Sequence, residues 1–165
     1  MNRDPIFLLS ETGSLQRVMR ADYDSELLLQ DLVDSYPELL AGEQISPTAP
    51  LHWLVIDKEV GIPDAVDASD RWALDILLVD NHSRPTLVEI KRSTDRRIRR
   101  EVVGQMLDYA ANAQLYWPVD RIRSLATQRY GGADNLDAEV ARLLGNEAEL
   151  ASEEIDKFWT AVSEN

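Results

Sequence analysis

The chain has 165 residues, the length of a single globular domain that can bury a hydrophobic core. It has no cysteine, which excludes disulfide bonds and thiolate metal sites, and its formal net charge of -13 argues against a general nucleic-acid coat protein, because such proteins bind by neutralising phosphates. Its apolar runs are far shorter than the ~20 residues that cross a bilayer, and residues 6–9 are too few for a signal-peptide core, so we expect a cytoplasmic protein without a membrane partner.

The first half of the chain predicts one helix and three strands. Residues 6–23 are ambiguous, and residues 14–21 fit either a strand or an irregular lead-in. Asp24 or Ser25 offers an N-cap with Glu26 in the first turn, and Pro37 marks the end of this helix. Its apolar residues at helical spacing are Leu27, Leu28, Leu32, Val33 and Tyr36. We predict strands over residues 52–60, 72–79 and 86–91, with a loop over 61–70 and a turn over 80–85.

The second half is predicted to be helical. Thr94 or Asp95 caps a long helix over residues 96–115, which Trp117-Pro118 ends. Its apolar stripe comprises Ile98, Val102, Val103, Met106, Leu107, Ala110 and Ala113. Shorter helices follow over residues 120–129, 136–144 and 152–162, with a break at Gly131-Gly132. The order of elements predicts a mixed α/β domain. Phe158 and Trp159 lie close to the C-terminus and need a docking surface. The chain is either truncated, with a further strand beyond Asn165, or completes its sheet in an unusual way.

Two of the predicted strands carry carboxylates in otherwise apolar sequence. A turn centred near His82 pairs residues whose numbers sum to about 164, so Asp75 lies opposite Glu89. Like charges at that spacing are destabilising, and Mg²⁺ would relieve the conflict because it binds one or two carboxylates. Lys91 lies two residues beyond Glu89, on the same face of the strand, where an ammonium can position a metal-bound water. The alternative is a Glu89–Lys91 ion pair, with Asp75 paired to an arginine.

Basic residues cluster directly after this strand. Six of the 17 Lys and Arg residues lie within ten positions, namely Lys91, Arg92, Arg96, Arg97, Arg99 and Arg100. The arginines either hold phosphates beside the metal or form a solvated helix face. From residue 133 onward acids dominate, and only Arg142 and Lys157 oppose them. Gln105 and Tyr109 are four residues apart and lie on one flank of the long helix, where they face the same cleft as Lys91 or form an ordinary helix edge.

Asp75, the tripeptide Glu89-Ile90-Lys91 and the run from Gln105 to Tyr109 resemble the motifs of the PD-(D/E)XK nuclease superfamily. The similarity is greatest to the branch with a Q-x-x-x-Y helix, as in RecB-like exonucleases and mismatch-type endonuclease domains. It covers residues 25–113. Alanine and leucine precede Asp75 where the family name has proline, and the final strand of the family core is not evident.

The resemblance implies a restriction-endonuclease-like α/β core of one helix, a three-stranded antiparallel sheet and a long helix, with extra C-terminal helices. The corresponding boundaries are a lead-in over residues 1–23, the nuclease-like core over 24–117 and a helical extension of the same domain over 118–165. Asp75, Glu89 and the Ile90 carbonyl would bind Mg²⁺ or Mn²⁺, and Lys91 would orient water. Glu26 would complete the site, with Asp31 and Asp34 as alternatives, while Gln105 and Tyr109 would contact the substrate or brace the site.

The sequence therefore predicts a Mg²⁺-dependent nuclease that hydrolyses phosphodiester bonds, with DNA favoured over RNA and a homodimer left open. Repair, restriction and defence against foreign DNA are all compatible with it. The alternative is a non-catalytic interaction module on the same fold, whose acidic face from residue 133 onward binds a protein partner.

Overall fold

The structure is a computed structural model that describes residues 5–19, 25–63, 70–92, 101–145 and 151–165. A three-stranded antiparallel sheet lies at the centre of the fold. The strands are β3 (Trp53–Pro63), β4 (Asp70–Asp80) and β5 (Pro85–Val88), in the order β3-β4-β5. The prediction of a loop over residues 61–70 is wrong at both ends, because β3 extends to Pro63 and β4 begins at Asp70. The predicted third strand is too long: β5 ends at Val88, so Glu89 and Lys91 follow the strand.

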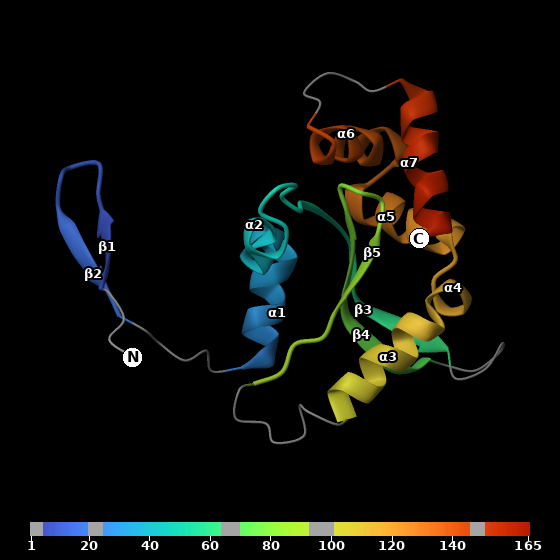
Figure 1. Ribbon diagram of the computed structural model, residues 1–165, viewed down its shortest axis with the longest axis horizontal. Coiled ribbons are helices and arrows are strands. Elements are labelled where there is room, and N and C mark those ends of the chain that lie inside the picture. The colour runs from blue at the N-terminus through green and yellow to red at the C-terminus, as the bar shows by residue number, and fades with distance from the viewer. Residues whose placement is uncertain (1–4, 20–24, 64–69, 93–100, 146–150) are drawn as a thin grey trace.

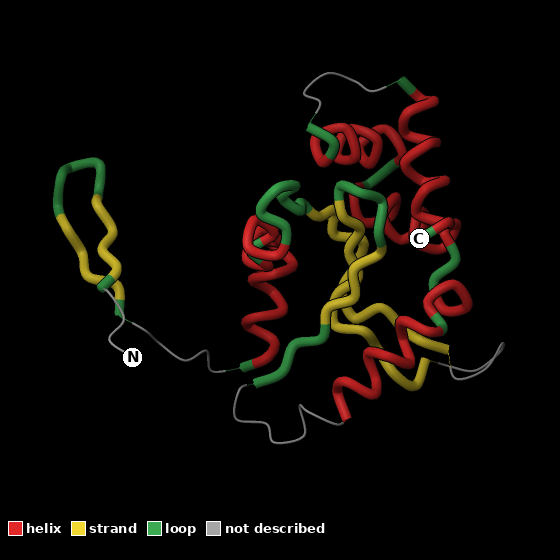
Figure 2. The backbone as a smooth tube through the Cα atoms, viewed as in Figure 1, coloured by secondary structure: helices red, strands yellow, loops and turns green. Residues whose placement is uncertain are grey.

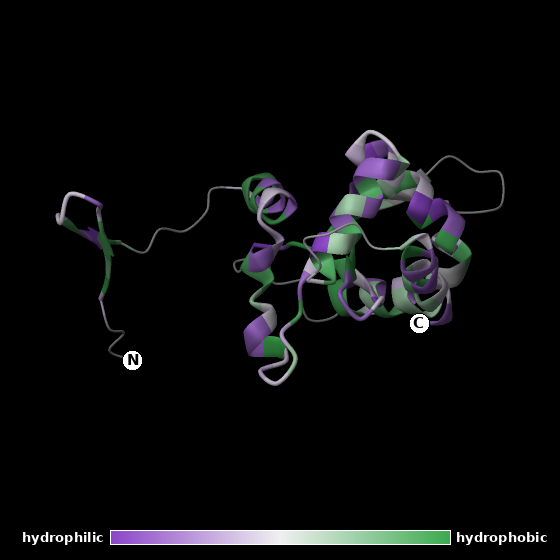
Figure 3. Ribbon diagram, turned by 90° about the horizontal axis from the view of Figure 1, so that it is seen from above, coloured by the Kyte–Doolittle hydropathy of each residue, from purple (hydrophilic) through white to green (hydrophobic). Residues whose placement is uncertain are grey.

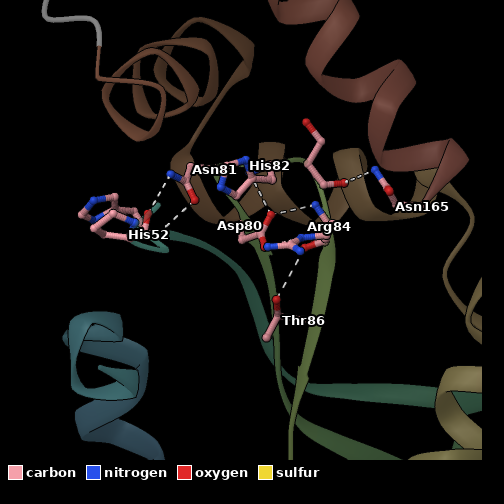
Figure 4. A network of polar contacts seen from close by, with 9 residues as sticks. His52, Asp80, Asn81, His82, Arg84, Thr86 and Asn165 are labelled. Carbon is pink, nitrogen blue, oxygen red and sulfur yellow. Dashed lines mark hydrogen bonds and ion pairs between the residues drawn. The ribbon is translucent and has the colours of Figure 1, made fainter. Parts of the chain in front are cut away.

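The turn between β4 and β5 fixes the register of the sheet (Figure 4). Asp80 is 2% exposed, and its Oδ1 accepts hydrogen bonds from the backbone N–H groups of His82 and Arg84, each at 2.9 Å. Its Oδ2 accepts a hydrogen bond from Arg84 Nε at 2.8 Å. Ser83 adopts a left-handed conformation with φ of 60°, which closes the turn. The resulting pairs, such as Ile76 with Val88, sum to 164, as the sequence predicts.

Helices cover both faces of the sheet (Figures 1 and 2). On one face, Val55, Ile76 and Leu78 form a buried cluster with Val33 of α1 (Glu26–Ser35). On the other face, the larger cluster joins strand residues such as Leu77 to the helices that follow the sheet. The alternation of Ile76, Leu77 and Leu78 between the two clusters is the two-residue period of a strand buried on both sides.

Helix α1 begins where the sequence predicts, but it packs on a different face. The Ser25 side chain accepts a hydrogen bond from Leu28 N at 3.1 Å, which confirms the predicted N-cap. Of the five apolar residues at helical spacing only Val33 is buried, while Leu27, Leu28, Leu32 and Tyr36 are exposed. The 3-10 helix η1 (Pro37–Leu40) and the short helix α2 (Gly42–Ile45) follow. Helical periodicity identified the helix, but the apolar residues of α1 extend around much of its circumference, and only tertiary packing decides which side meets the sheet.

The predicted long helix is two helices in the part of the chain described. Helix α3 spans Val103–Ala111 and α4 spans Ala113–Tyr116, and the residues 93–100 of the prediction lie outside the described residues. The predicted stripe is partly wrong, because Val103, Leu107 and Ala110 are exposed, whereas Met106 and Ala113 pack against the core. The side that packs includes Tyr109, which is 3% exposed. Tyr109, on the flank of the predicted stripe, thus packs against the core, and part of the stripe faces solvent.

The C-terminal helices share the larger core with the sheet. They are α5 (Val119–Tyr130), α6 (Ala133–Leu143) and α7 (Ser152–Glu164), each within a few residues of its prediction. Gly131, with φ of 75°, caps α5 and produces the predicted break. Phe158 and Trp159 are buried in the cluster that contains Leu77 and Tyr109, so α5, α6 and the sheet provide their docking surface. Among the described residues no strand follows α3, and no helix is long and apolar enough to traverse a bilayer.

The ambiguous N-terminal segment forms a β-hairpin of β1 (Ile6–Leu9) and β2 (Leu15–Val18). Its register pairs Ile6 with Val18 and Phe7 with Arg17. All eight strand residues are exposed. The hairpin lies apart from the sheet and its helices in two perpendicular views (Figures 1 and 3).

Candidate metal and catalytic site

The register of β4 and β5 brings Asp75 and Glu89 together. The last ladder pair joins Ile76 to Val88, so continuing the ladder by one residue places Asp75 opposite Glu89. Alternation along the strands puts both acids on the face of Leu77 and Leu87, which belongs to the larger core.

Lys91 bridges the two carboxylates. Its Nζ lies 2.7 Å from Glu89 Oε1 and 3.9 Å from Asp75 Oδ2. Asp75 Oδ2 also accepts a hydrogen bond from Ile90 N at 2.6 Å, which ties the acid on β4 to the segment that follows β5. The Glu89–Lys91 ion pair that the sequence left as an alternative therefore exists, and among the described residues Asp75 pairs with the same lysine and with no arginine.

Glu26 is the third acid at this point, and it comes from the first turn of α1. Its Oε2 lies 3.9 Å from Lys91 Nζ, and its Oε1 accepts a hydrogen bond from Arg92 N at 2.8 Å. The two alternatives for this role lie elsewhere: Asp31 pairs with Lys58 at 3.0 Å, and Asp34 pairs with Arg129 at 2.9 Å. Of the three candidates, Glu26 is the one that lies beside Lys91, because the first turn of α1 lies next to the segment that follows β5.

The cluster contains more negative than positive charge, and part of it is buried away from solvent. The Glu89 side chain is 5% exposed, and its Oε2 is buried without a hydrogen-bond partner. Burial raises the pKa of Glu89 above its ordinary value, and the charge of Asp75 raises it further, although the hydrogen bond to Lys91 lowers it in part. Burial lowers the pKa of Lys91, but Glu89, Asp75 and Glu26 together raise it above its ordinary value, so this amine stays protonated at neutral pH.

Gln105 and Tyr109 lie beside the carboxylates. Gln105 Nε2 donates a hydrogen bond to Tyr109 Oη, and Tyr109 is buried. Burial raises the pKa of Tyr109, the bond to Gln105 lowers it, and the charges of Glu89, Asp108 and Asp75 raise it further. The hydroxyl of Tyr109 therefore stays neutral and close to the acids, where it can donate a hydrogen bond.

The basic residues are only partly described. Arg92 is exposed, and its backbone binds Glu26. Arg96, Arg97, Arg99 and Arg100 lie outside the described residues.

The donor chemistry of the site fits a hard divalent cation, since carboxylate oxygens are the ligands that Mg²⁺ prefers. The buried, unpartnered Glu89 Oε2 is the group that such an ion would satisfy. In the described part of the chain, however, no set of three or more His, Asp or Glu side chains is already arranged around one metal position. The Lys91 ammonium lies among the three carboxylates and takes up part of their charge.

Two features of the site were not predicted from the sequence. Gln30 is 6% exposed, and its Nε2 donates a hydrogen bond to the backbone carbonyl of Asp75 at 3.0 Å. Gln30 lies four residues after Glu26, on the same side of α1, and this spacing could have indicated that Gln30 lies near the site. Glu59 of β3 has a φ of 52° and lies opposite Asp75, between the pairs that Lys58 and Val60 make with β4. The register is unbroken on both sides of Glu59, so this left-handed residue is no bulge; backbone strain of this kind is common at functional sites.

A cavity elsewhere in the described part of the chain does not contain these residues. It has a volume of about 790 Å³ and lies between the outer edge of β5, the C-terminal end of α3 and the end of α7, where Leu87, Trp117 and Val162 line it. Its lining offers few groups that could do chemistry, so the candidate site is the open acidic cluster. Comparison of the chain with protein-family models, with curated proteins and with solved structures found no match.

Proposed function

We propose that this protein is a metal-dependent nuclease with a restriction-endonuclease-like core. The order of α1, the antiparallel strands β3, β4 and β5, and the helix α3 agrees with the core that the sequence resemblance implies. DNA is the favoured substrate.

The observation that supports the proposal most strongly is the convergence of three carboxylates on one ammonium. Glu26, Asp75 and Glu89 come from α1, β4 and the segment after β5, and each has an oxygen within 3.9 Å of Lys91 Nζ. A purely structural ion pair needs one acid, and gathering two further acids costs free energy through mutual repulsion. Such a cost is typical of a site that binds a cation and performs chemistry.

The proposed chemistry assigns a role to each residue. Asp75 and Glu89 would hold Mg²⁺, helped by Glu26 and the Ile90 carbonyl, and the bound ion would polarise the scissile phosphate and lower the pKa of water. Lys91 would orient the attacking water and stabilise the negative charge that develops on the phosphate oxygens. Gln105 and Tyr109 would brace the carboxylates, and Arg92 would contact the phosphate backbone.

Cleavage of labelled nucleic acid tests this proposal. The protein is incubated with linear, circular and branched DNA, and with RNA, in Mg²⁺ and then in Mn²⁺. We expect Lys91→Ala and Glu89→Gln to lose activity by about 100-fold or more, the usual effect of removing a group that stabilises transition-state charge. Lys58→Ala is the matched control, because Lys58 is an exposed lysine that also pairs with a carboxylate, Asp31, at 3.0 Å.

Either of two results would contradict the nuclease. The first is cleavage by Lys91→Ala at the wild-type rate. The second is a wild-type protein that cuts none of the substrates with either metal.

A non-catalytic interaction module is the second candidate, and the exposed acids of α6 and α7 favour it. Asp134, Glu153, Glu154 and Asp156 are exposed and suit a basic protein partner. Isothermal titration with Mg²⁺ or Mn²⁺ separates the candidates. A nuclease should bind the metal saturably, and Glu89→Gln should abolish that binding, whereas a pure interaction module should give no signal that depends on Glu89.

A further inference from the structure

The N-terminal hairpin exposes an apolar surface on both of its faces. This hairpin surface comprises Ile6, Phe7, Leu8, Leu9, Leu15 and Val18, whose side chains are between 41% and 70% exposed. Strand β1 has four apolar residues in succession, a pattern that is typical of strands covered on both sides. A two-stranded hairpin is at best marginally stable in water unless its apolar face packs against something. The hairpin therefore needs a partner surface.

A second exposed apolar surface lies on α1 and on the 3-10 helix η1 that follows it. This helix surface comprises Leu27, Leu28, Leu32, Tyr36 and Leu39, which are between 38% and 57% exposed. Val33, which packs on the sheet, lies about 140° around α1 from Leu28. A helix that is apolar on two sides is normally buried between two layers, and only the sheet side of α1 is covered.

We propose that two copies of the chain form a symmetric dimer in which the hairpin surface of each copy packs on the helix surface of the other. Such an exchange gives the Phe7 face of each hairpin and the helix surface of each copy a partner about one two-fold axis, so the assembly closes at two chains. Residues 5–19 and 26–45 comprise fifteen and twenty residues per copy, enough for the roughly 20–30 residues a side of a standard interface even though some of them are buried within their own chain.

Charge favours this exchange over the pairing of like surfaces. From residue 25 to residue 57 the chain has six acidic residues and no Lys or Arg; Asp31 pairs with Lys58, while Glu38 is exposed next to Leu39 of the helix surface. Two helix surfaces in contact would bring these acids together. The hairpin instead carries Arg17, which lies opposite Phe7 on one face of the hairpin and can meet an acid of the partner copy. In both Figure 1 and Figure 3 the hairpin stands away from the α1 of its own chain.

Two single substitutions remove one surface each while preserving the local fold. Leu28 is three residues after the Ser25 cap, so Leu28→Glu creates a capping box, which favours the helix. Phe7 pairs with Arg17 across the hairpin, so Phe7→Glu creates an opposite-charge pair, which favours the hairpin. Leu115→Glu is the control, because Leu115 is 72% exposed on α4 and belongs to neither surface.

Light scattering coupled to gel filtration gives the mass of each sample. We expect about twice the monomer mass of 18.7 kDa for the wild type and for Leu115→Glu, and the monomer mass for Phe7→Glu and for Leu28→Glu. An equimolar mixture of Phe7→Glu with Leu28→Glu should regain dimers. In a mixed pair the intact hairpin of one chain meets the intact α1 of the other, so one of the two contacts is restored.

Three results would overturn the exchange. A monomeric wild type at ~100 μM, far above typical specific dissociation constants, would show that no second copy covers these surfaces. If the wild type is a dimer but the mixture of Phe7→Glu with Leu28→Glu stays monomeric, hairpin surfaces pair with hairpin surfaces and helix surfaces with helix surfaces. A mass above that of two chains would show that the contact builds larger assemblies instead of a closed dimer.

Discussion

The acids of the candidate site destabilise the fold. Asp75 and Glu89 are neighbours on a partly buried face, and one lysine serves them both. Glu89 accounts for most of this loss of stability, because its Oε2 is buried without a hydrogen-bond partner. A single acid paired with a single base would give a more stable fold than this cluster does, so stability alone does not explain the cluster.

The raised pKa of Glu89 predicts how stability depends on pH. Its pKa in the folded state lies above the ordinary value of 4.5, so the folded protein binds the Glu89 proton more tightly than the unfolded protein does. The contribution of Glu89 is therefore most favourable below pH 4.5 and is lost as pH rises through the folded-state value. Glu89→Gln stays neutral at every pH, so we expect it to unfold at a higher urea concentration than wild type at pH 7.5.

The gap between these two proteins should shrink as pH falls towards 4. Urea titrations at the two pH values measure it. Glu153→Gln removes an exposed acid from α7 and serves as the control, with little change in stability expected. A gap that stays constant or widens in acid would contradict the proposed origin of the effect.

At the scale of elements, the β4–β5 turn positions the site. The buried Asp80 carboxylate holds the turn through His82 N, Arg84 N and the Arg84 guanidinium, and this turn sets the register that places Asp75 opposite Glu89 (Figure 4). Helix α1 then adds Glu26 at its first turn and Gln30 one turn later, each bonded to the backbone of one site segment.

Asp80→Ala should therefore affect both stability and activity. The substitution leaves two backbone N–H groups without their acceptor, and we expect it to lower the free energy of unfolding by about 3 kcal/mol. Metal-dependent cleavage should fall as well at temperatures where the variant is still folded, because the strands lose the constraint on their register. Urea unfolding and the cleavage assay measure the two effects. A variant with wild-type stability and activity would show that the register is set elsewhere.

At the scale of the whole molecule, the C-terminal helices and the sheet form one core. Trp159 of α7 is 3% exposed in the cluster that contains Leu77 of β4 and Tyr109 of α3. The residues after the predicted nuclease-like core thus contribute directly to the packing of the face that carries Asp75 and Glu89.

Trp159→Ala should destabilise the entire sheet. Truncating a buried tryptophan costs about 3–5 kcal/mol, and its unpartnered indole N–H means that no hydrogen bond is lost. We expect circular dichroism and the fluorescence of the remaining tryptophans to report one shared transition at lower urea. Lys157→Ala, on the exposed side of the same helix, should leave the midpoint nearly unchanged. Separate transitions for helices and sheet would contradict a single cooperative core.

The sequence by itself determined the approximate positions of most elements, because these signals are local. Ser25 and Gly131 mark helix ends, and a turn centred on His82 set the pairing of Asp75 with Glu89. The likeness of the acids to a nuclease motif also came from sequence alone, and the resulting function stays a prediction until cleavage is measured.

The tertiary structure decided which sides of the helices are buried and which acid joins the site. Helical periodicity cannot say which of two apolar sides of α1 meets the sheet, and it missed Gln30 because a buried amide has no apolar signal. Which of Glu26, Asp31 and Asp34 lies beside Lys91 depended on how α1 is placed against the sheet. These outcomes depend on contacts between residues far apart in the chain, which no local pattern contains.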